Sequence, residues 1–233
     1  MRVFISLFFF LSFSLNATQI TVVTEIFPDF QYLDENNKII GRSVDTVRKA
    51  LDATDISYSI SAHNWSVSYN AVLRDESTCI FSIVRLPNRE NKFVWIGELE
   101  NFDSAIYALK SRHIKINTLN DAKRYKTAVL RDNFSHHYLL ERGFSELKNL
   151  LLIDNFDKID KLMTTRHNML DFIILSKNQF DYRSKTELKL KKLEPVYKLN
   201  TVNSPLFFAC NVNMDTETVS KLRAGFTATS MMK

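Results

Sequence analysis

Strand-like and helix-like segments alternate along the chain, and this alternation constrains the fold more than any other feature of the sequence. Apolar, β-branched or alternating runs at residues 19–24, 56–60 and 79–84 predict strands. The stretches 43–51 and 65–74 between them place apolar side chains at helical spacing, which predicts helices. The order strand, helix, strand, helix, strand is typical of an α/β architecture in which helices pack on a mainly parallel sheet. We therefore predict an α/β fold.

The alternation begins again near residue 110 and continues to about residue 198. Strands are expected at 126–130, 151–153 and 171–175, and a helix at 157–166. These segments predict a second α/β unit at residues 110–198.

The end of the chain is too short to be a domain of its own. Residues 205–210 have strand character and residues 216–226 form an amphipathic helical pattern. One strand and one helix bury too little surface to be stable alone. We expect residues 199–233 to return to the first unit, residues 18–109, so that two lobes are joined by two connections. Such a pair of connections forms a hinge over an interlobe cleft.

The first residues have the layout of a secretory signal peptide. An uninterrupted apolar tract covers residues 3–15, Arg2 precedes it, and Ala17 provides the small residue of a cleavage site. The tract is shorter than the roughly 20 residues that a membrane-spanning helix needs. We predict that residues 1–17 are removed and that the mature chain is a soluble periplasmic protein.

Charge is spread evenly along the chain. The formal net charge is +5, without a block of like charges, and this disfavours nucleic-acid binding. The sequence contains no nucleophile elbow, zinc-protease motif, phosphate-binding loop or dinucleotide motif, and it has only 4 glycines with which to build phosphate-cradling loops. We predict a protein that is not an enzyme and needs no cofactor.

Two histidines and two cysteines are the candidates for metal or redox chemistry. His136 and His137 are adjacent, and adjacent side chains on a helix point about 100° apart, so we predict surface histidines and no metal site. Cys79 and Cys210 lie in apolar, strand-like runs without zinc-ligand spacing. They are either two small buried hydrophobic residues or a disulfide, which an extracytoplasmic compartment permits.

A turn with two arginines is a candidate for ligand binding. The apolar strand at 79–84 ends in a turn through Pro87 that carries Arg85 and Arg89. Arginine keeps its charge at any working pH, and its planar fork of donors matches a carboxylate. Both residues are therefore candidates to hold a small anion, and the alternative is a pair of solvated loop charges.

Four aromatic side chains of the first unit are candidates to cover a ligand. Trp65 and Tyr69 lie four residues apart, on one face of a predicted helix, where they either pack in the core or line the cleft. Phe27 and Phe30 flank Pro28 in a turn, and large apolar groups seldom occupy turns without a reason. We expect one of these two phenylalanines to touch the ligand.

In this order the segments resemble the extracytoplasmic solute-binding proteins of family 3, the substrate-binding type of amino-acid ABC transporters. Besides the signal peptide, residues 24–30 resemble the family's te-x-x-P-P-F and residues 41–45 its G-x-x-V-D. Further matches follow along the chain: Trp65 with Tyr69, residues 83–90 with Phe93 and Trp95, and Asp171. The resemblance implies a type II periplasmic-binding-protein fold, a venus-flytrap of two lobes.

The resemblance also implies roles for particular residues. The family arginine that matches Arg89 takes the α-carboxylate of the ligand, helped by a hydroxyl near the position of Ser82. Donors at a helix start in the second lobe close over the anion. The corresponding turn in this chain is Asn133-Phe134-Ser135.

One departure from the family concerns the ligand's ammonium group. Amino-acid binders usually hold it with an acidic residue five positions beyond Asp171, and this chain has Ser176 there. A hydroxyl cannot offset a buried ammonium as a carboxylate does. With Asp171 and Ser176 in the expected site, the implied ligand is a small polar or carboxylated molecule, and an ordinary amino acid is not assumed.

These observations predict a monomeric solute-binding protein whose lobes close on a small-molecule ligand, by selection of a closed state. It would serve ABC-type uptake through a permease, or a sensor partner. Two alternatives remain at this stage. One is a periplasmic enzyme of the dehydratase or lyase kind that uses Glu25 or a cleft aspartate, and the other is an orphan ligand-sensing module.

Overall fold

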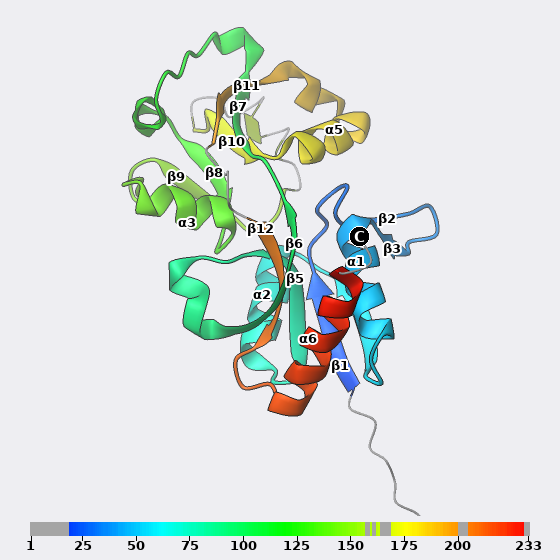
Figure 1. Ribbon diagram of the computed structural model, residues 1–233. Coiled ribbons are helices and arrows are strands. Elements are labelled where there is room, and N and C mark those ends of the chain that lie inside the picture. Colours follow the sequence, from blue (N-terminus) through cyan, green and yellow to red (C-terminus); the bar gives the residue numbers. More distant parts are fainter. Residues whose placement is uncertain (1–18, 157–158, 160–161, 164–168, 200–204, 231–233) are drawn as a thin grey trace, which may run out of the picture.

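The computed structural model describes residues 19–156, 159, 162–163, 169–199 and 205–230. The predicted signal peptide, residues 1–17, lies outside the described residues, as does most of the helix predicted at 157–166. Figure 1 shows two lobes stacked along the long direction of the molecule, with extended segments passing from one to the other. No helix in the described part of the chain is long and apolar enough to cross a membrane.

The first lobe is built on a five-stranded sheet in the order β4-β1-β5-β12-β6. Its strands are β1 (Gln19–Thr24), β4 (Ser57–Ala62), β5 (Thr78–Val84), β6 (Phe93–Asn101) and β12 (Pro205–Asn211). Strand β1 pairs parallel with β4 and β5, and β12 pairs antiparallel with β5 and β6. A hairpin of β2 (Tyr32–Leu33) and β3 (Ile39–Ile40) extends from this lobe.

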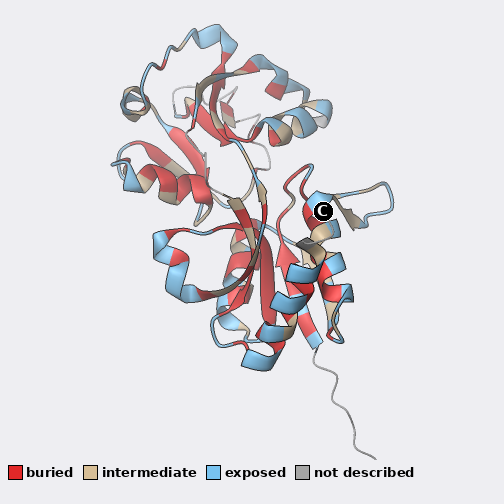
Figure 2. Cartoon of the chain, viewed as in Figure 1, coloured by how far each residue is buried: buried red, intermediate tan, exposed pale blue. Residues whose placement is uncertain are grey.

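Helices cover both faces of this sheet because its strands are apolar on both sides. Helices α1 (Arg42–Asp52) and α6 (Thr216–Ser230) contribute to one hydrophobic cluster, and α2 (Trp65–Arg74) contributes to another. Successive residues of β1 divide in the same way, since Val22 joins the first cluster and Val23 the second. Figure 2 shows the buried strands as the centre of the lobe and exposed residues on the outer helix faces.

The second lobe is built on a sheet in the order β11-β7-β10-β8-β9. Its strands are β7 (Ala105–Leu109), β8 (Thr127–Leu130), β9 (Leu150–Ile153), β10 (Phe172–Leu175) and β11 (Leu193–Lys198). The helices are α3 (Phe134–Glu141) and α5 (Lys177–Thr186), and the short 3-10 turns of the molecule are η1 (Pro87–Lys92), η2 (Lys110–Arg112), η3 (Leu119–Arg124) and η4 (Leu188–Lys192). Strands β8, β9 and β10 are parallel to one another, and β7 pairs antiparallel with β10 and β11.

Strand β7 corrects one predicted boundary. We expected the first lobe to extend to residue 109, but β7 belongs to the second sheet, so the chain changes sheets at residues 102–104. The residues of β7 form an apolar run. A run of this kind shows that a segment is extended, and long-range pairing decides which sheet it joins.

The C-terminal segment returns to the first lobe. Strand β12 lies between β5 and β6 in the sheet, and α6 packs against α1. The packing is close at Gly225, where a Cβ atom would lie 2.3 Å from the carbonyl oxygen of Ala50. The sequence left the state of the two cysteines open, and the structure decides it: Cys79 of β5 and Cys210 of β12 form a disulfide, and both residues are fully buried.

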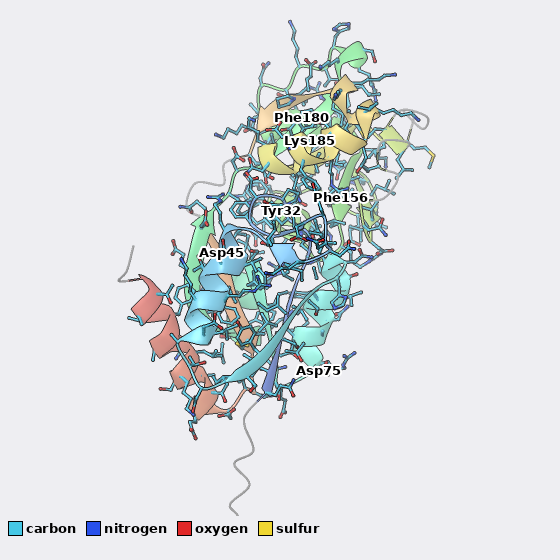
Figure 3. All side chains as sticks on the ribbon, turned by 90° about the vertical axis from the view of Figure 1, so that its right-hand side faces the viewer. Tyr32, Asp45, Asp75, Phe156, Phe180 and Lys185 are labelled. Atoms are coloured by element: carbon cyan, nitrogen blue, oxygen red, sulfur yellow. A yellow bond between two sulfur atoms is a disulfide. The ribbon has the colours of Figure 1, made fainter. Side chains whose placement is uncertain are left out.

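The two lobes also touch through side chains. The ring of Tyr32 in the hairpin lies 6.2 Å from the ring of Tyr182 in α5, measured between centroids. Figure 3 shows Tyr32 at the level where the lobes meet, with Phe180 and Lys185 in the second lobe and Asp75 at the far end of the first. The α/β, two-lobe prediction is therefore confirmed, with the boundary moved by one strand.

Candidate ligand-binding site

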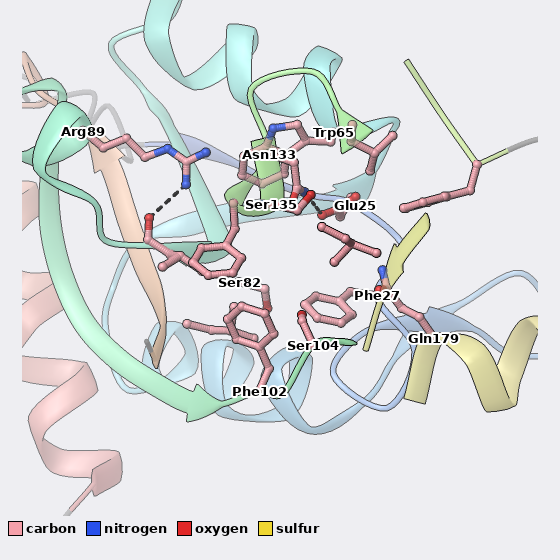
Figure 4. A pocket seen from close by; sticks show the side chains of 16 residues that line it. Glu25, Phe27, Trp65, Ser82, Arg89, Phe102, Ser104, Asn133, Ser135 and Gln179 are labelled. Carbon is pink, nitrogen blue, oxygen red and sulfur yellow. Dashed lines mark hydrogen bonds between the residues drawn. The ribbon is translucent and has the colours of Figure 1, made fainter. Parts of the chain in front are cut away.

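A cavity lies between the lobes and is walled by side chains from both. About 490 Å³ between these side chains is free of protein atoms, a space that includes solvent at the open mouth. The first lobe contributes Glu25, Phe27, Trp65, Ser82, Val84, Arg89 and Leu206, and the second contributes Leu130, Asn133, Phe134, Ser135, Phe156, Ile174 and Gln179. Phe102 and Ser104 line it from the crossing segment. Figure 4 shows these side chains converging on the cavity.

Arg89 is buried in the cavity wall and is already bonded to the protein. Its Nη1 donates to the carbonyl oxygen of Val84 at 2.9 Å, and its Nη2 donates to the carbonyl oxygen of Asp132 in the second lobe. Its Cζ lies 5.3 Å and 5.2 Å from the ring centroids of Trp65 and Tyr69. Burial lowers the pKa of the guanidinium. The two terminal nitrogens that we expected to meet a ligand carboxylate thus each donate to a carbonyl, one from each lobe, and among the described residues Nε has no hydrogen-bond partner.

Arg85, the other arginine of the turn, lies apart from the cavity. Its guanidinium forms an ion pair with Glu90, and its Cζ lies over the rings of Trp95 and Phe207 at 5.3 Å and 5.9 Å from their centroids. Both partners of the pair remain 44% exposed. The surface alternative that the sequence left open describes Arg85, whereas Arg89 is fully buried.

The four aromatic candidates divide into two groups. Phe27 and Trp65 line the cavity, whereas Tyr69 stacks on Trp65 from behind, with ring centroids 5.5 Å apart. Phe30 is buried against Phe27, with centroids 4.8 Å apart, and lies outside the cavity lining. One phenylalanine of the turn therefore faces the cavity, and the other holds it in place.

Ser82 reaches the cavity from a distorted point in strand β5. Its φ of 61° is left-handed, and the pairing of β5 with β12 shifts register beside it, which is the signature of a β-bulge. Its hydroxyl donates to Gln31 Oε1 at 2.8 Å, and Gln31 Nε2 donates to the hydroxyl of Thr24 at 3.0 Å. Bulges near functional sites re-aim a side chain, and here the bulge turns Ser82 toward the cavity.

The turn Asn133-Phe134-Ser135 lies in the second-lobe wall, at the start of α3. Asn133 is the N-cap of this helix, and its side chain accepts a hydrogen bond from the Ser135 amide at 3.4 Å. Its Nδ2 also donates to Glu25 Oε1 at 3.1 Å, across the cleft. All three residues of the predicted turn thus face the cavity.

Asp171 and Ser176 have structural contacts away from the cavity lining. Asp171 forms an ion pair with Arg112 and accepts a hydrogen bond from the Lys126 amide at 2.7 Å. Ser176 is the N-cap of α5 in a capping box with Gln179, and it is 2% exposed. Gln179, the partner of Ser176 in the capping box, does line the cavity.

Glu25 is a site residue that the predicted ligand-binding residues did not include, although the enzyme alternative named it. It follows β1 directly, is 9% exposed, and lines the cavity. Burial raises the pKa of its carboxyl to about 7, although the hydrogen bond from Asn133 and the charges of Arg183 and Arg89 act in the opposite direction. A charged residue immediately after a buried parallel strand is the signal that could have identified it, because ligands of open α/β sheets bind beyond the carboxyl ends of the strands.

The raised pKa of Glu25 leads to a pH-dependent stability. The folded-state pKa of about 7 lies above the value near 4.5 in the unfolded chain, so between these values the folded protein binds more protons and stability falls as the pH rises. We expect the free energy of unfolding of the wild type to fall by about 2.5 kcal/mol between pH 5 and pH 8, relative to Glu25→Gln. Urea unfolding at both pH values measures this. The exposed control Glu76→Gln should show the same change in the free energy of unfolding as the wild type. If the wild type and Glu25→Gln changed equally between the two pH values, the raised pKa of Glu25 would be contradicted.

The histidine pair differs from the prediction. His136 is 4% exposed and His137 is half-buried, so the interpretation of both as surface histidines is wrong. Ligand atoms of Asp132, His136 and His137 lie within 4.8 Å of one another. The nitrogens of His136 are already bonded to the Asp132 amide and to Glu146. Burial and the Arg89 charge lower the pKa of His137 to about 4. Because that same charge opposes a cation, we assign no metal to this cluster.

The fold and the cleft place the chain in a structural class, the two-lobe periplasmic-binding-protein fold. A histidine kinase sensor domain with similarity to periplasmic binding proteins matches with a TM-score of 0.77 at 20% identity, over 93% of this chain and 92% of that chain. An ancestral arginine-binding protein bound to arginine matches with a TM-score of 0.75 at 16% identity, over 91% and 92%.

A third similar structure comes from work on glutathione import by GshT and the cystine ABC importer TcyBC of Streptococcus mutans. It matches with a TM-score of 0.72 at 17% identity, over 93% of this chain and 90% of that chain. Identities this low show the fold alone. No protein-family model matches the chain, and no curated protein matches it in sequence.

Proposed function

We propose that this protein is a periplasmic solute-binding protein of the type II class, related to family 3, that captures a small polar ligand of amino-acid size between its lobes. The observation that carries the proposal is the interlobe cavity, whose opposite walls are joined by Asn133 and Glu25. A ligand that fills this cavity contacts both lobes and so favours the closed state. Burial raises the pKa of the Glu25 carboxyl, and buried groups with shifted pKa values are common in ligand-binding sites.

The captured solute would serve uptake or sensing. The similar structures include a sensor domain of a histidine kinase and a structure from work on a cystine ABC importer, so the proposal covers either role. We propose that removal of residues 1–17 produces the mature chain and that this chain acts as a monomer. In its closed state it would bind an ABC permease or a sensor partner.

A thermal-shift screen of amino acids, amines and organic acids tests the proposed function. A solute at a concentration 100 times its Kd stabilises the folded state by about 2.7 kcal/mol, which raises the Tm of a chain of this size by about 5–10 °C. Asn133→Ala should reduce that shift because it removes the side-chain bond across the cleft, whereas the exposed control Asn91→Ala should not. If no solute of the panel raises the Tm, the proposal fails.

A second candidate is an enzyme on the same scaffold, favoured by the pKa of Glu25. A carboxyl with a pKa of about 7 is suited to general acid–base catalysis. The same value also follows from burial alone, and among the described residues of the cavity Arg89 is the other charged side chain, which is a poor proton donor. Incubation of each stabilising solute with the protein, followed by mass analysis, separates the two: unchanged solute supports binding, and turnover supports the enzyme.

A further inference from the structure

The two charged side chains of the cavity differ in how their charges are already balanced. Both terminal nitrogens of Arg89 donate to carbonyl oxygens, and ring faces of Trp65 and Tyr69 lie against its guanidinium. The bond from Nη2 to the carbonyl oxygen of Asp132 is a contact between the lobes. Arg89 therefore stabilises the contact between the lobes, and within the described part of the chain its Nε is buried without a hydrogen-bond partner.

The Glu25 carboxyl has fewer hydrogen-bond partners than the Arg89 guanidinium. Among the described residues, Asn133 is the single hydrogen-bond donor to its carboxylate, at 3.1 Å. An ionised carboxylate has about four acceptor positions, and burying one with so few partners is costly. This is why burial dominates the pKa of Glu25. The charges of Arg183 and Arg89 act on the carboxyl but do not overcome burial, so a positively charged group directly beside the carboxylate would offset more of that cost.

Aromatic side chains surround the same space. Five rings line the cavity: Phe27, Trp65, Phe102, Phe134 and Phe156. Phe102 contacts Phe27 and Phe134 edge to face, with centroids 5.8 Å and 5.3 Å apart, and Figure 4 shows Glu25 between Trp65 and Phe27 on the wall. Ring faces attract organic cations, more strongly where water is excluded. Ring faces do not attract anions in this way.

A second cavity gives room for the rest of such a ligand. It encloses about 970 Å³ up to its open mouth and shares Glu25, Trp65, Leu130 and Phe156 with the first. The Glu25 carboxylate thus borders both spaces. A ligand held by a cationic end at Glu25 can extend into either cavity.

We propose that the ligand is an organic amine whose ammonium group lies against the Glu25 carboxylate between the aromatic walls, and that binding requires no carboxylate on the ligand. This inference rests on the proposed function, because it names the class of solute that the same cavity takes. It assigns charge recognition to Glu25, in place of the arginine turn that the sequence favoured.

A matched series of five-carbon probes tests the inference with the mature chain: pentylamine, 5-aminopentanoate, pentanoate and pentanamide. Titration calorimetry should show that pentylamine binds at least about tenfold more tightly than pentanoate and pentanamide, and no more weakly than 5-aminopentanoate. Glu25→Gln should lose at least about tenfold in amine affinity. The exposed control Glu76→Gln should bind as the wild type does, and thermal unfolding of each variant confirms that it is folded.

The outcomes separate the two proposals. If pentanoate or another organic acid binds and the amines do not, or if Glu25→Gln binds pentylamine as the wild type does, this inference is overturned while the proposed function stands. If neither these probes nor any solute of the wider screen binds, both are overturned.

Discussion

Replacing both bridged cysteines, as Cys79→Ala with Cys210→Ala, is expected to lower the free energy of unfolding by about 4 kcal/mol. The disulfide links residues separated by 131 positions, and a cross-link that closes so long a loop removes much conformational freedom from the unfolded chain. It also ties β12, which returns from the second lobe, to the centre of the first sheet. The Tm should fall by about 10 °C.

Thermal unfolding with and without dithiothreitol measures the contribution of the disulfide. Both cysteines are fully buried, so the reductant acts when the protein unfolds. It should lower the Tm of the wild type to that of the double variant and leave the double variant unchanged. A double variant that unfolds at the wild-type temperature would show that the bridge does not stabilise the fold.

Arg89→Met is expected to lower the free energy of unfolding by about 3 kcal/mol. The substitution keeps a long apolar stem but leaves the carbonyl oxygens of Val84 and Asp132 without the donors that they have in the wild type. Unpaired buried polar groups are costly, and bonds to a charged donor are stronger than neutral ones. The contacts of the guanidinium with the Trp65 and Tyr69 rings are lost as well.

Arg85→Met is the matched control, because it makes the same change in the same turn. Arg85 pairs with Glu90 at the surface, and exposed ion pairs contribute at most about 1 kcal/mol. Urea unfolding of the two variants at pH 7 compares them. Equal losses of stability would contradict the division of the turn into one buried arginine and one exposed arginine.

Much of the fold could be predicted because it depends on local patterns. The apolar run of β5, the helical spacing of α1 and α2, and the shortness of the C-terminal segment are all visible over a few residues. Such patterns reflect which side of a helix or strand must face a core. They were enough to predict an α/β molecule of two lobes, in which the last strand and helix return to the first lobe.

The candidate site could be predicted only in part. Arg89, Ser82, Phe27, Trp65 and the turn at 133–135 do line the cavity. Asp171 and Ser176 were placed there by resemblance, but their side chains have capping and ion-pair partners elsewhere. Glu25 was named for the enzyme alternative but not as a ligand-binding residue, because its donor, Asn133, is 108 positions away in the sequence.

The sequence by itself determined the order and kind of the elements, the two-lobe architecture and the presence of an arginine turn, since these depend on periodicity and composition within short segments. Only the tertiary structure decided that β7 joins the second sheet and that Cys79 meets Cys210. It also decided that Arg89 donates to carbonyls of both lobes and that Glu25 lies buried in the cavity wall with Asn133 as its hydrogen-bond donor. The reason is physical: the partners of a buried charge, a strand edge or a thiol come from distant parts of the chain, and local patterns carry no record of them.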